Sequence, residues 1–326
     1  MNVPQGAMPQ AAMTEPLPQL PPRPADGHKG TFGTVCILGG RADDQRVMIG
    51  GPAFAAQGAL RSGCGLAVLA VPTPVMAAAL VITPSATGLA LPVDENGLLK
   101  PSDVANLLDR HMPQYQCLAM GPGLGSDVAQ QQIVVRLIAQ DQVPLVIDAD
   151  ALNALANLPD FHRDLRASAV LTPHPGEFKR LAENLGIKAD PIDPAKRQAA
   201  AVELARRLGC VVVLKGHQTV ISDGLETFEN QTGNVALATG GTGDVLTGVI
   251  AGFIAQFFKP DLGTGSRQVT AQQRGGLNLL QCARLAVHVH GVAADRWAAR
   301  HGQAGMLATD LLLELPEALA SLRAAK

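Results

Sequence analysis

The sequence lacks the charge patterns and long apolar runs that mark nucleic-acid-binding and membrane proteins. Its 26 basic and 28 acidic residues give a formal net charge of -2, and the basic residues form no block. A binder of nucleic acid or of an anionic membrane usually carries such a block. No apolar run is long enough to span a bilayer, and the N-terminus lacks the charged start and apolar segment of a signal peptide. We therefore expect no nucleic-acid partner and no membrane association.

Clustered cysteines are also missing. The five cysteines are odd in number, scattered and free of C-x-x-C spacing, and three of them lie in or beside apolar runs. This pattern is typical of buried, reduced thiols, so we expect a cytoplasmic protein. The residues are Cys36, Cys64, Cys117, Cys210 and Cys282.

The first 25 residues differ in composition from the rest of the chain. They are rich in Pro, Gln, Ala and Met, and they predict an extended or disordered tail without chemistry. The chain as a whole is 47% hydrophobic, which is ample for the core of one large α/β domain over residues 26–326. Within this domain, the polar stretch 258–275 is predicted to be a surface loop.

Apolar runs alternate with helical patterns along the domain. The runs are typical of buried parallel strands and lie at 35–38, 65–72, 117–120, 143–147, 169–172 and 210–214. Predicted helices lie at about 50–62, 74–81, 127–139, 177–185, 194–208 and 277–301. Short runs on either side of 222–224 predict a small hairpin. The repetition predicts an α/β fold with a doubly wound, mostly parallel sheet of about eight or more strands flanked by helices.

The stretch from Gly240 to Asp244 leads directly into an apolar helical pattern at 245–257. Glycines let a ligand approach the backbone, and the start of a helix offers free N–H groups and a positive dipole end, which suit a phosphate. Asp244, in the first turn, would take the proton of a hydroxyl while the amides stabilise the transferred phosphoryl group. This predicts a phosphoryl-transfer site. The alternative is an Asp that caps the helix after a flexible turn.

A second glycine turn, Gly121-Pro122-Gly123-Leu124-Gly125, follows the predicted strand 117–120. It fails the dinucleotide fingerprint G-x-G-x-x-G because Ser126 occupies the last position, and no Walker A motif is present. A turn of this kind at a strand end can still contact a ligand. The alternative is a purely structural turn.

Carboxylates and a histidine follow two further strands. Asp148 and Asp150 come after the strand 143–147, where they suit a ligand site, although Asp150 would equally serve as a helix cap. His174 lies between two prolines that fix its direction, with Glu177 three positions later. Since the carboxyl ends of parallel strands share one edge of a sheet, all these motifs are expected at the same edge. By contrast, His288 and His290 are two apart and make a poor metal pair, so core packing is expected for at least one.

These motifs occur in one order together with several others. They are H-K-G-T-F-G and I-L-G-G within 28–40, G-P-G-L-G at 121–125, D-A-D-A-L-N at 148–153, L-T-P-H-P-G-E at 171–177, V-L-K-G-H-Q-T at 213–219, G-N at 233–234 and G-G-T-G-D-V-L-T-G at 240–248. As a set they resemble the ADP- or ATP-dependent NAD(P)H-hydrate dehydratases of the ribokinase-like superfamily. The resemblance covers roughly residues 26–326, and G-T-G-D alone would indicate only the superfamily.

The resemblance implies an activity that repairs damaged cofactors. NADH and NADPH that have become hydrated on the nicotinamide ring no longer donate hydride. The family phosphorylates the ring hydroxyl from a nucleotide and then eliminates phosphate, which restores the double bond. With ADP as the donor, the products are NAD(P)H, AMP and phosphate. Phosphate is a good leaving group where hydroxide is a poor one, so a kinase scaffold can act as a lyase.

The resemblance also implies a role for each matching position. Asp244 would be the base on the hydroxyl, and the anion hole would consist of Gly241, Thr242 and Gly243. The adenine nucleotide would be bound by Lys215, Gly216, His217, Gln218, Thr219 and Gly243. The hydrated dinucleotide would contact Pro52, Ala53, Gly123, His174 and Asp244. Pro52 departs from the small residue of the family pattern, and Ala53 is its substitute.

Cofactor and assembly follow from the same resemblance. The segment at 174–177 has the spacing of the N-x-x-E motif of related kinases, whose Glu helps to organise magnesium, so Glu177 would act on Mg²⁺ indirectly, with His174 in the Asn position. K-G-H-Q-T resembles the form in stand-alone bacterial members, which use ADP, so ADP is expected, with ATP as the alternative donor. The tail is too short for the epimerase domain that is often fused to bacterial members, so a dehydratase alone is expected. Family members commonly form tetramers, and a homotetramer is expected.

Two rival functions share the same motifs. One is a kinase of a small alcohol, of the thiamine-precursor or pyridoxal type, which would release a stable phosphorylated product. The other is a non-catalytic nucleotide-binding protein, against which the presence of Asp244 argues.

Overall fold

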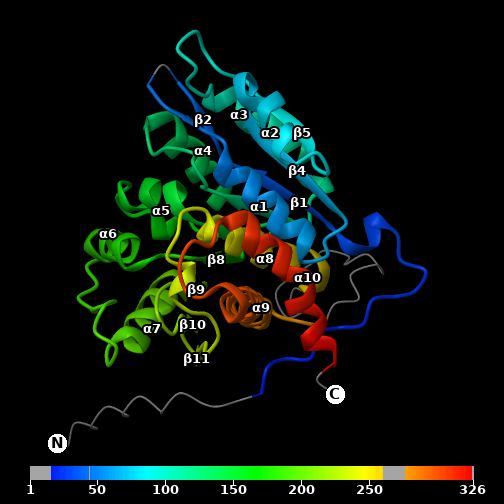
Figure 1. Cartoon of the computed structure of the whole chain (residues 1–326). Helices are drawn as coiled ribbons and strands as arrows, with labels where there is room; N and C mark the ends of the chain where they lie inside the picture. Colours follow the sequence, from blue (N-terminus) through cyan, green and yellow to red (C-terminus); the bar gives the residue numbers. More distant parts are fainter. Residues whose placement is uncertain (1–15, 44, 260–275, 325–326) are drawn as a thin grey trace, which may run out of the picture.

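The computed structural model describes residues 16–43, 45–259 and 276–324, which form one sheet with helices on both faces (Figure 1). The sheet has nine strands in the order β11-β10-β9-β8-β7-β6-β1-β4-β5. Their bounds are β1 Thr34–Leu38, β4 Leu66–Pro72, β5 Thr87–Leu91, β6 Cys117–Met120, β7 Leu145–Ile147, β8 Ala169–Leu171, β9 Val211–Leu214, β10 Val220–Ser222 and β11 Thr227–Glu229. Among the described strands of this sheet, β10 pairs antiparallel with both β9 and β11, and all other pairs are parallel. The predicted doubly wound, mostly parallel sheet is confirmed.

The chain reverses its direction of growth at β1. From β1 it adds β4 and β5 on one side, then returns to add β6 to β9 on the other side. β1 pairs in parallel with both β4 and β6, with Leu38 opposite Ala70 and Met120. The topological switch point therefore lies between the carboxyl ends of β1 and β6, which is where open α/β sheets bind their ligands.

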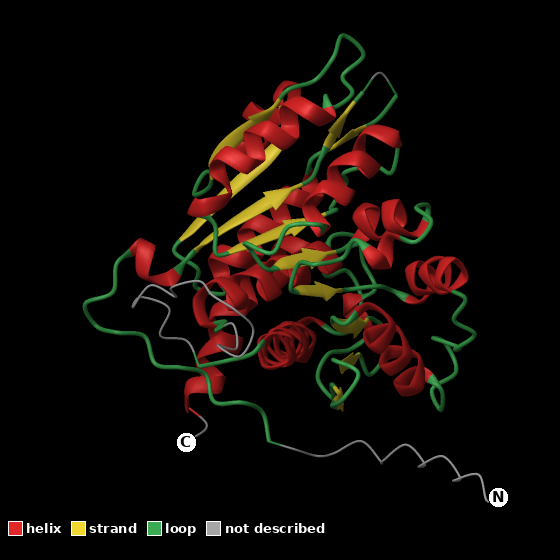
Figure 2. Cartoon of the chain, turned by 180° about the vertical axis from the view of Figure 1, so that it is seen from behind, coloured by secondary structure: helices red, strands yellow, loops and turns green. Residues whose placement is uncertain are grey.

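Two groups of helices cover the two faces, and each contributes to its own apolar core (Figure 2). The helices of one face are α1 Gly50–Arg61, α2 Met76–Ile82, α8 Thr242–Phe257, α9 Leu279–His301 and α10 Ala308–Ala324. Those of the other face are α3 Pro101–His111, α4 Val128–Ile138, α5 Ala149–Ala156, α6 Pro175–Leu185 and α7 Arg197–Leu208. Within the described ranges, none of the helices is long and apolar enough to cross a membrane.

α1 and α8 are in direct backbone contact. A Cβ atom on Gly248 would lie 1.9 Å from the carbonyl oxygen of Ala55, and one on Gly58 would lie 2.5 Å from that of Val245. Both distances are far below van der Waals contact, so only glycine fits at these two positions. The Ala/Gly-rich composition of the predicted helix 50–62 thus produces a close crossing, which fixes the start of α8 over the switch point.

The remaining elements are short or lay outside the predicted set. β2 (Arg41–Ala42) and β3 (Val47–Met48) form a small antiparallel ribbon. Single 3₁₀ turns are η1 Lys29–Phe32, η2 Thr73–Val75, η3 Met112–Gln114, η4 Phe161–Arg163 and η5 Val235–Leu237. The predictions included neither this ribbon nor β5, α3 and α10. Most of the predicted loop 258–275 (residues 260–275) lies outside the described residues.

The described end of the predicted tail contacts the domain. Arg23 donates to the carbonyl oxygen of Gly63 at 2.8 Å and to the side chain of Gln256 at 2.9 Å, and its guanidinium lies over the ring of Phe32. Residues 16–25 form neither helix nor strand. The tail predicted over residues 1–25 stays a prediction, since residues 1–15 lie outside the described residues.

Candidate active site

Asp244 lies in the first turn of α8 at the switch point. Gly241 begins the helix with a left-handed φ of +91°, a conformation that glycine adopts without strain. The hydroxyl of Thr242 donates to the carbonyl oxygens of Leu237 at 2.8 Å and Thr239 at 3.0 Å, which fixes the turn. The N-terminal amides of α8 are therefore held in place beside the Asp244 carboxylate, as an anion site requires.

α1 and the glycine turn after β6 both approach the Asp244 carboxylate. A Cβ on Gly51 would lie 3.3 Å from Oδ2 of Asp244 and 3.2 Å from Cβ of Pro122. Gly40 donates its N–H to the carbonyl oxygen of Pro122 at 3.0 Å, so the loops after β1 and β6 are bonded to each other. Gly51 was missed in the sequence, where the motif positions pointed to Pro52 and Ala53.

Burial and, next, the charge of Asp148 raise the pKa of Asp244 and Lys215 opposes them, with a net pKa of about 7. A carboxyl group with a pKa near neutrality is divided between its two protonation states at pH 7. This is the condition in which a group transfers protons most effectively as a general base.

Lys215, directly after β9, connects the carboxylates of the site. Its Nζ lies 2.7 Å from Oδ1 of Asp148 and 3.8 Å from Oε2 of Glu177. Nζ is also 3.7 Å from the position of a Cβ on Gly243, so the ammonium faces the start of α8. Burial lowers the pKa of Lys215, but Asp148 and Glu177 outweigh burial and raise the pKa. The lysine is therefore held as a cation beside the anion site.

Asp148 is the most buried of the three carboxylates, with 1% of its surface exposed. Besides Lys215, it accepts a hydrogen bond of 2.6 Å from Thr247 of α8. Burial acts to raise the pKa of Asp148, but Lys215 and the hydrogen bonds lower it overall, so the group is ionised. Asp148 thereby joins the end of β7 to α8 and to the lysine after β9.

The backbone is strained where Asp148 and Asp150 diverge. Ala149, between them, has a φ of +48°, which a residue with a Cβ rarely adopts. Asp148 points to Lys215, whereas Asp150 accepts the N–H of Gly125 at 2.8 Å. Because of this one strained residue, Asp148 can bond to Lys215 while Asp150 bonds to the glycine turn at 121–125.

His174 caps α6 through a reciprocal pair of hydrogen bonds. Its Nδ1 accepts the N–H of Gly176 at 2.9 Å, and Oε2 of Glu177 accepts the N–H of His174 at 2.8 Å. Because Nδ1 is the acceptor, the neutral ring carries its proton on Nε2, the outer nitrogen of the half-exposed ring. This Nε2 lies 3.4 Å from Oε1 of Glu177, so the ring faces the carboxylate that it caps. Burial raises the pKa of Glu177 and Lys215 opposes this.

The other predicted residues lie around this cluster. Gly123 has a φ of +63° and lies under Met48 of β3, with Cβ of Met48 3.2 Å from the position of its own missing Cβ. Pro52 is buried beside Gly39, while Ala53 has 0% exposure. Residues 216–218 are exposed after Lys215, and the hydroxyl of Thr219 donates to the carbonyl oxygen of Gly216 at 3.1 Å.

His290 supports the anion site from beneath. Its Nε2 lies 2.9 Å from the carbonyl oxygen of Thr242, and burial lowers its pKa to about 4. The neutral ring donates to this carbonyl and helps to hold the turn before Asp244. The sequence predicted core packing for at least one of His288 and His290, and His290 is buried. Its contact with Thr242 was missed, because no sequence pattern links the two residues.

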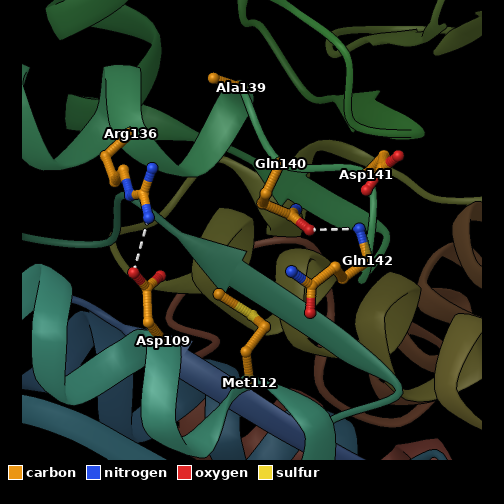
Figure 3. Close-up of a pocket in the computed structure, with 7 residues that line it drawn as sticks. All are labelled: Asp109, Met112, Arg136, Ala139, Gln140, Asp141 and Gln142. Carbon is orange, nitrogen blue, oxygen red and sulfur yellow. Dashed lines mark hydrogen bonds and ion pairs between the residues drawn. The ribbon is translucent and has the colours of Figure 1, made fainter.

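A separate cavity of about 370 Å³ lies at the opposite edge of the sheet (Figure 3). It is bounded by the ends of α3 and α4 and the loop that precedes β7, and its lining includes Asp109, Arg136 and Gln140. Asp109 and Arg136 form an exposed ion pair at 2.7 Å, and Gln140 bonds the N–H groups of its own loop. These groups satisfy one another, and none of the predicted site residues lies here.

Known proteins resemble the chain over nearly its whole length. A sequence model of the NAD(P)H-hydrate dehydratase family matches residues 35–317. The chain is 39% identical over 306 residues to a bifunctional NAD(P)H-hydrate repair enzyme of Moorella thermoacetica, covering 93% of this chain and 52% of that protein. It is 36% identical over 299 residues to the ADP-dependent (S)-NAD(P)H-hydrate dehydratase of Bacillus subtilis, covering 91% and 92%.

A crystal structure of the ADP/ATP-dependent NAD(P)H-hydrate dehydratase of Bacillus subtilis, co-crystallised with ATP and Mg²⁺, has the same fold. The TM-score is 0.68 at 32% identity, and the match covers 93% of this chain and 95% of the other. The predicted ribokinase-like fold is confirmed. The chain spans about half the length of the bifunctional relatives, with 52% of the Moorella protein covered.

Proposed function

Because the chain belongs to the NAD(P)H-hydrate dehydratase family, we propose that it is an ADP-dependent (S)-NAD(P)H-hydrate dehydratase. In this proposal it phosphorylates the ring hydroxyl of hydrated NADH or NADPH from ADP and eliminates phosphate, so that NAD(P)H, AMP and phosphate are released. The proposal depends on one observation above all: a carboxylate with a pKa near 7 lies at the amide-lined start of α8, beside a mostly buried lysine.

The first step would use the residues around α8. Asp244 takes the proton of the ring hydroxyl as the oxygen attacks the terminal phosphorus of the nucleotide. The amides of Gly241, Thr242 and Gly243 stabilise the charge of the transferred group, and Lys215 adds a fixed positive charge on the same side. AMP is then the leaving group of the transfer.

The second step would need little from the protein. The lone pair of the ring nitrogen expels the phosphate with the electrons of the carbon–oxygen bond, and the adjacent ring carbon then gives its proton to the departing phosphate, which restores the double bond. The same anion site that stabilised the transfer holds the departing phosphate. Contacts from Pro52, Ala53, Gly123 and the half-exposed side chain of His174 would keep the nicotinamide ring in place, with the buried Ala53 acting through the shape of α1.

The nucleotide would bind along residues 215–219 and Gly243, with Mg²⁺ on its phosphates. Both oxygens of Glu177 have protein partners, and among the residues described by the structure no three His, Cys, Asp or Glu side chains gather as a metal-holding group. Mg²⁺ commonly binds through substrate phosphates and water. The residues therefore fit an ion that neutralises nucleotide charge, with Glu177 acting on it indirectly. The relative co-crystallised with ATP and Mg²⁺ supports this assignment.

The location and assembly are also proposals. All five cysteines are buried and unpaired, which supports a cytoplasmic location. A homotetramer remains a prediction from the family resemblance.

The test is a repair assay with the purified protein, NADH hydrate and Mg²⁺, followed by the absorbance of reduced nicotinamide. We expect recovery with ADP, with AMP and phosphate formed in equal amounts. Recovery with ATP alone would keep the repair function and change the donor. A folded protein that binds nucleotide but restores no absorbance with either donor would contradict the proposal and favour the small-alcohol kinase.

A further inference from the structure

Arg197, the first residue of α7, is a buried cation directly under the nucleotide loop, defined here as residues 215–219. Only 8% of its surface is exposed. Its guanidinium donates to the carbonyl oxygens of Pro191 at 3.0 Å, Leu214 at 3.0 Å and Lys215 at 3.3 Å. Two of these acceptors are the last residue of β9 and the first residue of the nucleotide loop. Arg197 therefore bonds the point at which the loop leaves the sheet.

Gly216 and Arg197 fit each other closely. A Cβ on Gly216 would lie 2.9 Å from one terminal nitrogen of Arg197 and 3.0 Å from the other, so the guanidinium packs against the bare backbone of the loop. Gly216 also has a φ of +143°, which residues with a Cβ rarely adopt. Both the shape and the backbone conformation of the loop thus depend on this pair.

The charge of Arg197 is balanced by no direct anion. Its contacts are neutral carbonyls, no carboxylate of the described residues lies within ion-pair distance, and its Nε is buried without a partner. Burial lowers the pKa of Arg197 and the more distant Glu229 raises it, but a guanidinium keeps its charge in proteins. A buried cation without a counterion is unfavourable by itself. An anion on the exposed side of the loop would relieve this.

The Lys215 backbone is held from two sides. Its N–H donates to the carbonyl oxygen of Pro173 at 2.9 Å, and its own carbonyl accepts from Arg197. With both ends of the residue fixed, the side chain extends to Asp148 and to the start of α8. Arg197 thus acts on the anion site through Lys215 without contacting it.

We infer that Arg197 is a positioning residue that shapes the nucleotide loop and gives it a permanent positive charge, so that it selects a nucleotide by its phosphates. This inference rests on the proposed function, because it takes the loop to bind a nucleoside diphosphate or triphosphate. It goes further by assigning the affinity for phosphate charge to a residue outside the motifs. Arg197 should therefore affect binding of the polyphosphate part of the ligand and leave binding of the adenosine part unchanged.

The experiment measures binding of ADP and of adenosine to Arg197→Lys and Arg197→Met by calorimetry, without the hydrate. For Arg197→Met, the loss of a nearby unit charge is expected to raise the Kd for ADP about tenfold or more, and that for adenosine less than about twofold. Arg197→Lys keeps the positive charge but loses the planar guanidinium with its paired N–H donors, so the Kd for ADP is expected to rise about threefold. The matched control is Arg206→Met, on the same helix, whose guanidinium donates to Gly224 of the hairpin turn. It should leave both Kd values unchanged.

Steady-state kinetics separate positioning from general destabilisation. Arg197→Lys should raise the KM for ADP while the KM for the hydrate stays within about twofold. Equal weakening of ADP and adenosine binding, or an unchanged Kd for ADP, would overturn the inference. If Arg197→Met does not fold, Gly216→Ala is used in its place, since the methyl group of the alanine would displace the guanidinium of Arg197. Unchanged ADP binding in both Gly216→Ala and Arg197→Lys would equally overturn the inference. A wild-type protein that binds ADP but repairs no hydrate would contradict only the proposed function.

Discussion

Lys215 separates two regions of the site that are built by different means. Toward α8, the groups are charged and buried, and they bond to one another: Asp148 to Lys215 and Thr247, and Glu177 to the backbone of His174. Toward the solvent, residues 216–218 are exposed, and Arg197 holds the backbone just before them through the neutral carbonyls of Leu214 and Lys215. We call the first region the charge cluster, which consists of Asp148, Glu177, Asp244 and the side chain of Lys215. The name nucleotide loop is kept for residues 215–219.

The difference indicates that one region determines turnover and the other determines nucleotide affinity. The charge cluster has strong, mutually dependent interactions, so a change in one member alters the protonation or position of the others. Residues 216–219 of the nucleotide loop have few side-chain interactions and follow a fixed start, so a change there should alter affinity with little effect on chemistry. Turnover and nucleotide affinity are therefore expected to respond to different substitutions.

The largest expected effect is that of Asp244→Asn, which removes the base and leaves the volume unchanged. Turnover should fall about 10³-fold or more, because general base catalysis contributes on this scale, while the Kd for ADP changes little. Single-turnover repair assays and calorimetry check both parts. Asp103→Asn is the matched control, since Asp103 is an exposed carboxylate in the first turn of α3. Parallel loss of ADP binding in Asp244→Asn would show that the two regions are not separate.

A smaller but broader effect is expected from Asp148→Asn. This change leaves Lys215 with only Glu177 at 3.8 Å, and removing one partner of a mostly buried ion pair should lower the free energy of unfolding by about 2–4 kcal/mol. The displaced lysine should also reduce turnover about 100-fold. Urea unfolding and the repair assay measure the two effects. Asp150→Asn, two residues away, keeps an acceptor for the N–H of Gly125 and should change neither by much. Equal effects of the two substitutions would argue against a special role for Asp148.

The smallest effect is a pH dependence that has opposite signs for activity and stability. Since Asp244 must be ionised to act as a base, kcat/KM should rise about tenfold per pH unit below 7 and level off above it. Its folded pKa of about 7 lies above the model-peptide value of 3.8. The folded state thus binds more protons between these values, so this contribution to stability is present at pH 4 and lost as the pH rises through 7.

Comparison with Asp244→Asn isolates this contribution, because the Asn variant should lack the decline in unfolding free energy between pH 4 and 7. Since the charge of Asp148 raises the pKa of Asp244, Asp148→Asn should move the midpoint of the activity profile to lower pH. A midpoint that stays in place would show that the cluster is not electrostatically coupled.

The edge of the sheet that carries the site could be predicted from the sequence. Strands of continuous apolar residues imply parallel pairing, and parallel pairing brings the residues after each strand to one edge. Asp148, His174 and Lys215 are thereby expected together without knowledge of any distance. The motif at Gly240 to Asp244 adds the helix start that faces them.

Contacts that depend on the crossing of distant elements could not be predicted. Gly51 meets Asp244 only because α1 crosses α8 at backbone distance, and a glycine in an Ala/Gly-rich helix carries no sign of its neighbour. Arg197 lies in a polar helix start that matches no motif, and its position depends on where the loop leaves β9. β5, α3 and α10 lay in segments for which the sequence analysis made no prediction. The roles of Pro52, Ala53 and the other contact residues stay predictions.

The contact between α1 and α8 has a consequence for how the site responds to heat. Side chains change rotamer readily on warming, whereas two main chains that touch through Gly58 and Gly248 have no rotamers to change. The distance between Asp244 and the loops of the switch point should therefore stay constant over temperatures at which the rest of the interior is already rearranging. Thermal loosening of the site would begin at residues 216–218, so nucleotide affinity should weaken on warming before the geometry of proton transfer does.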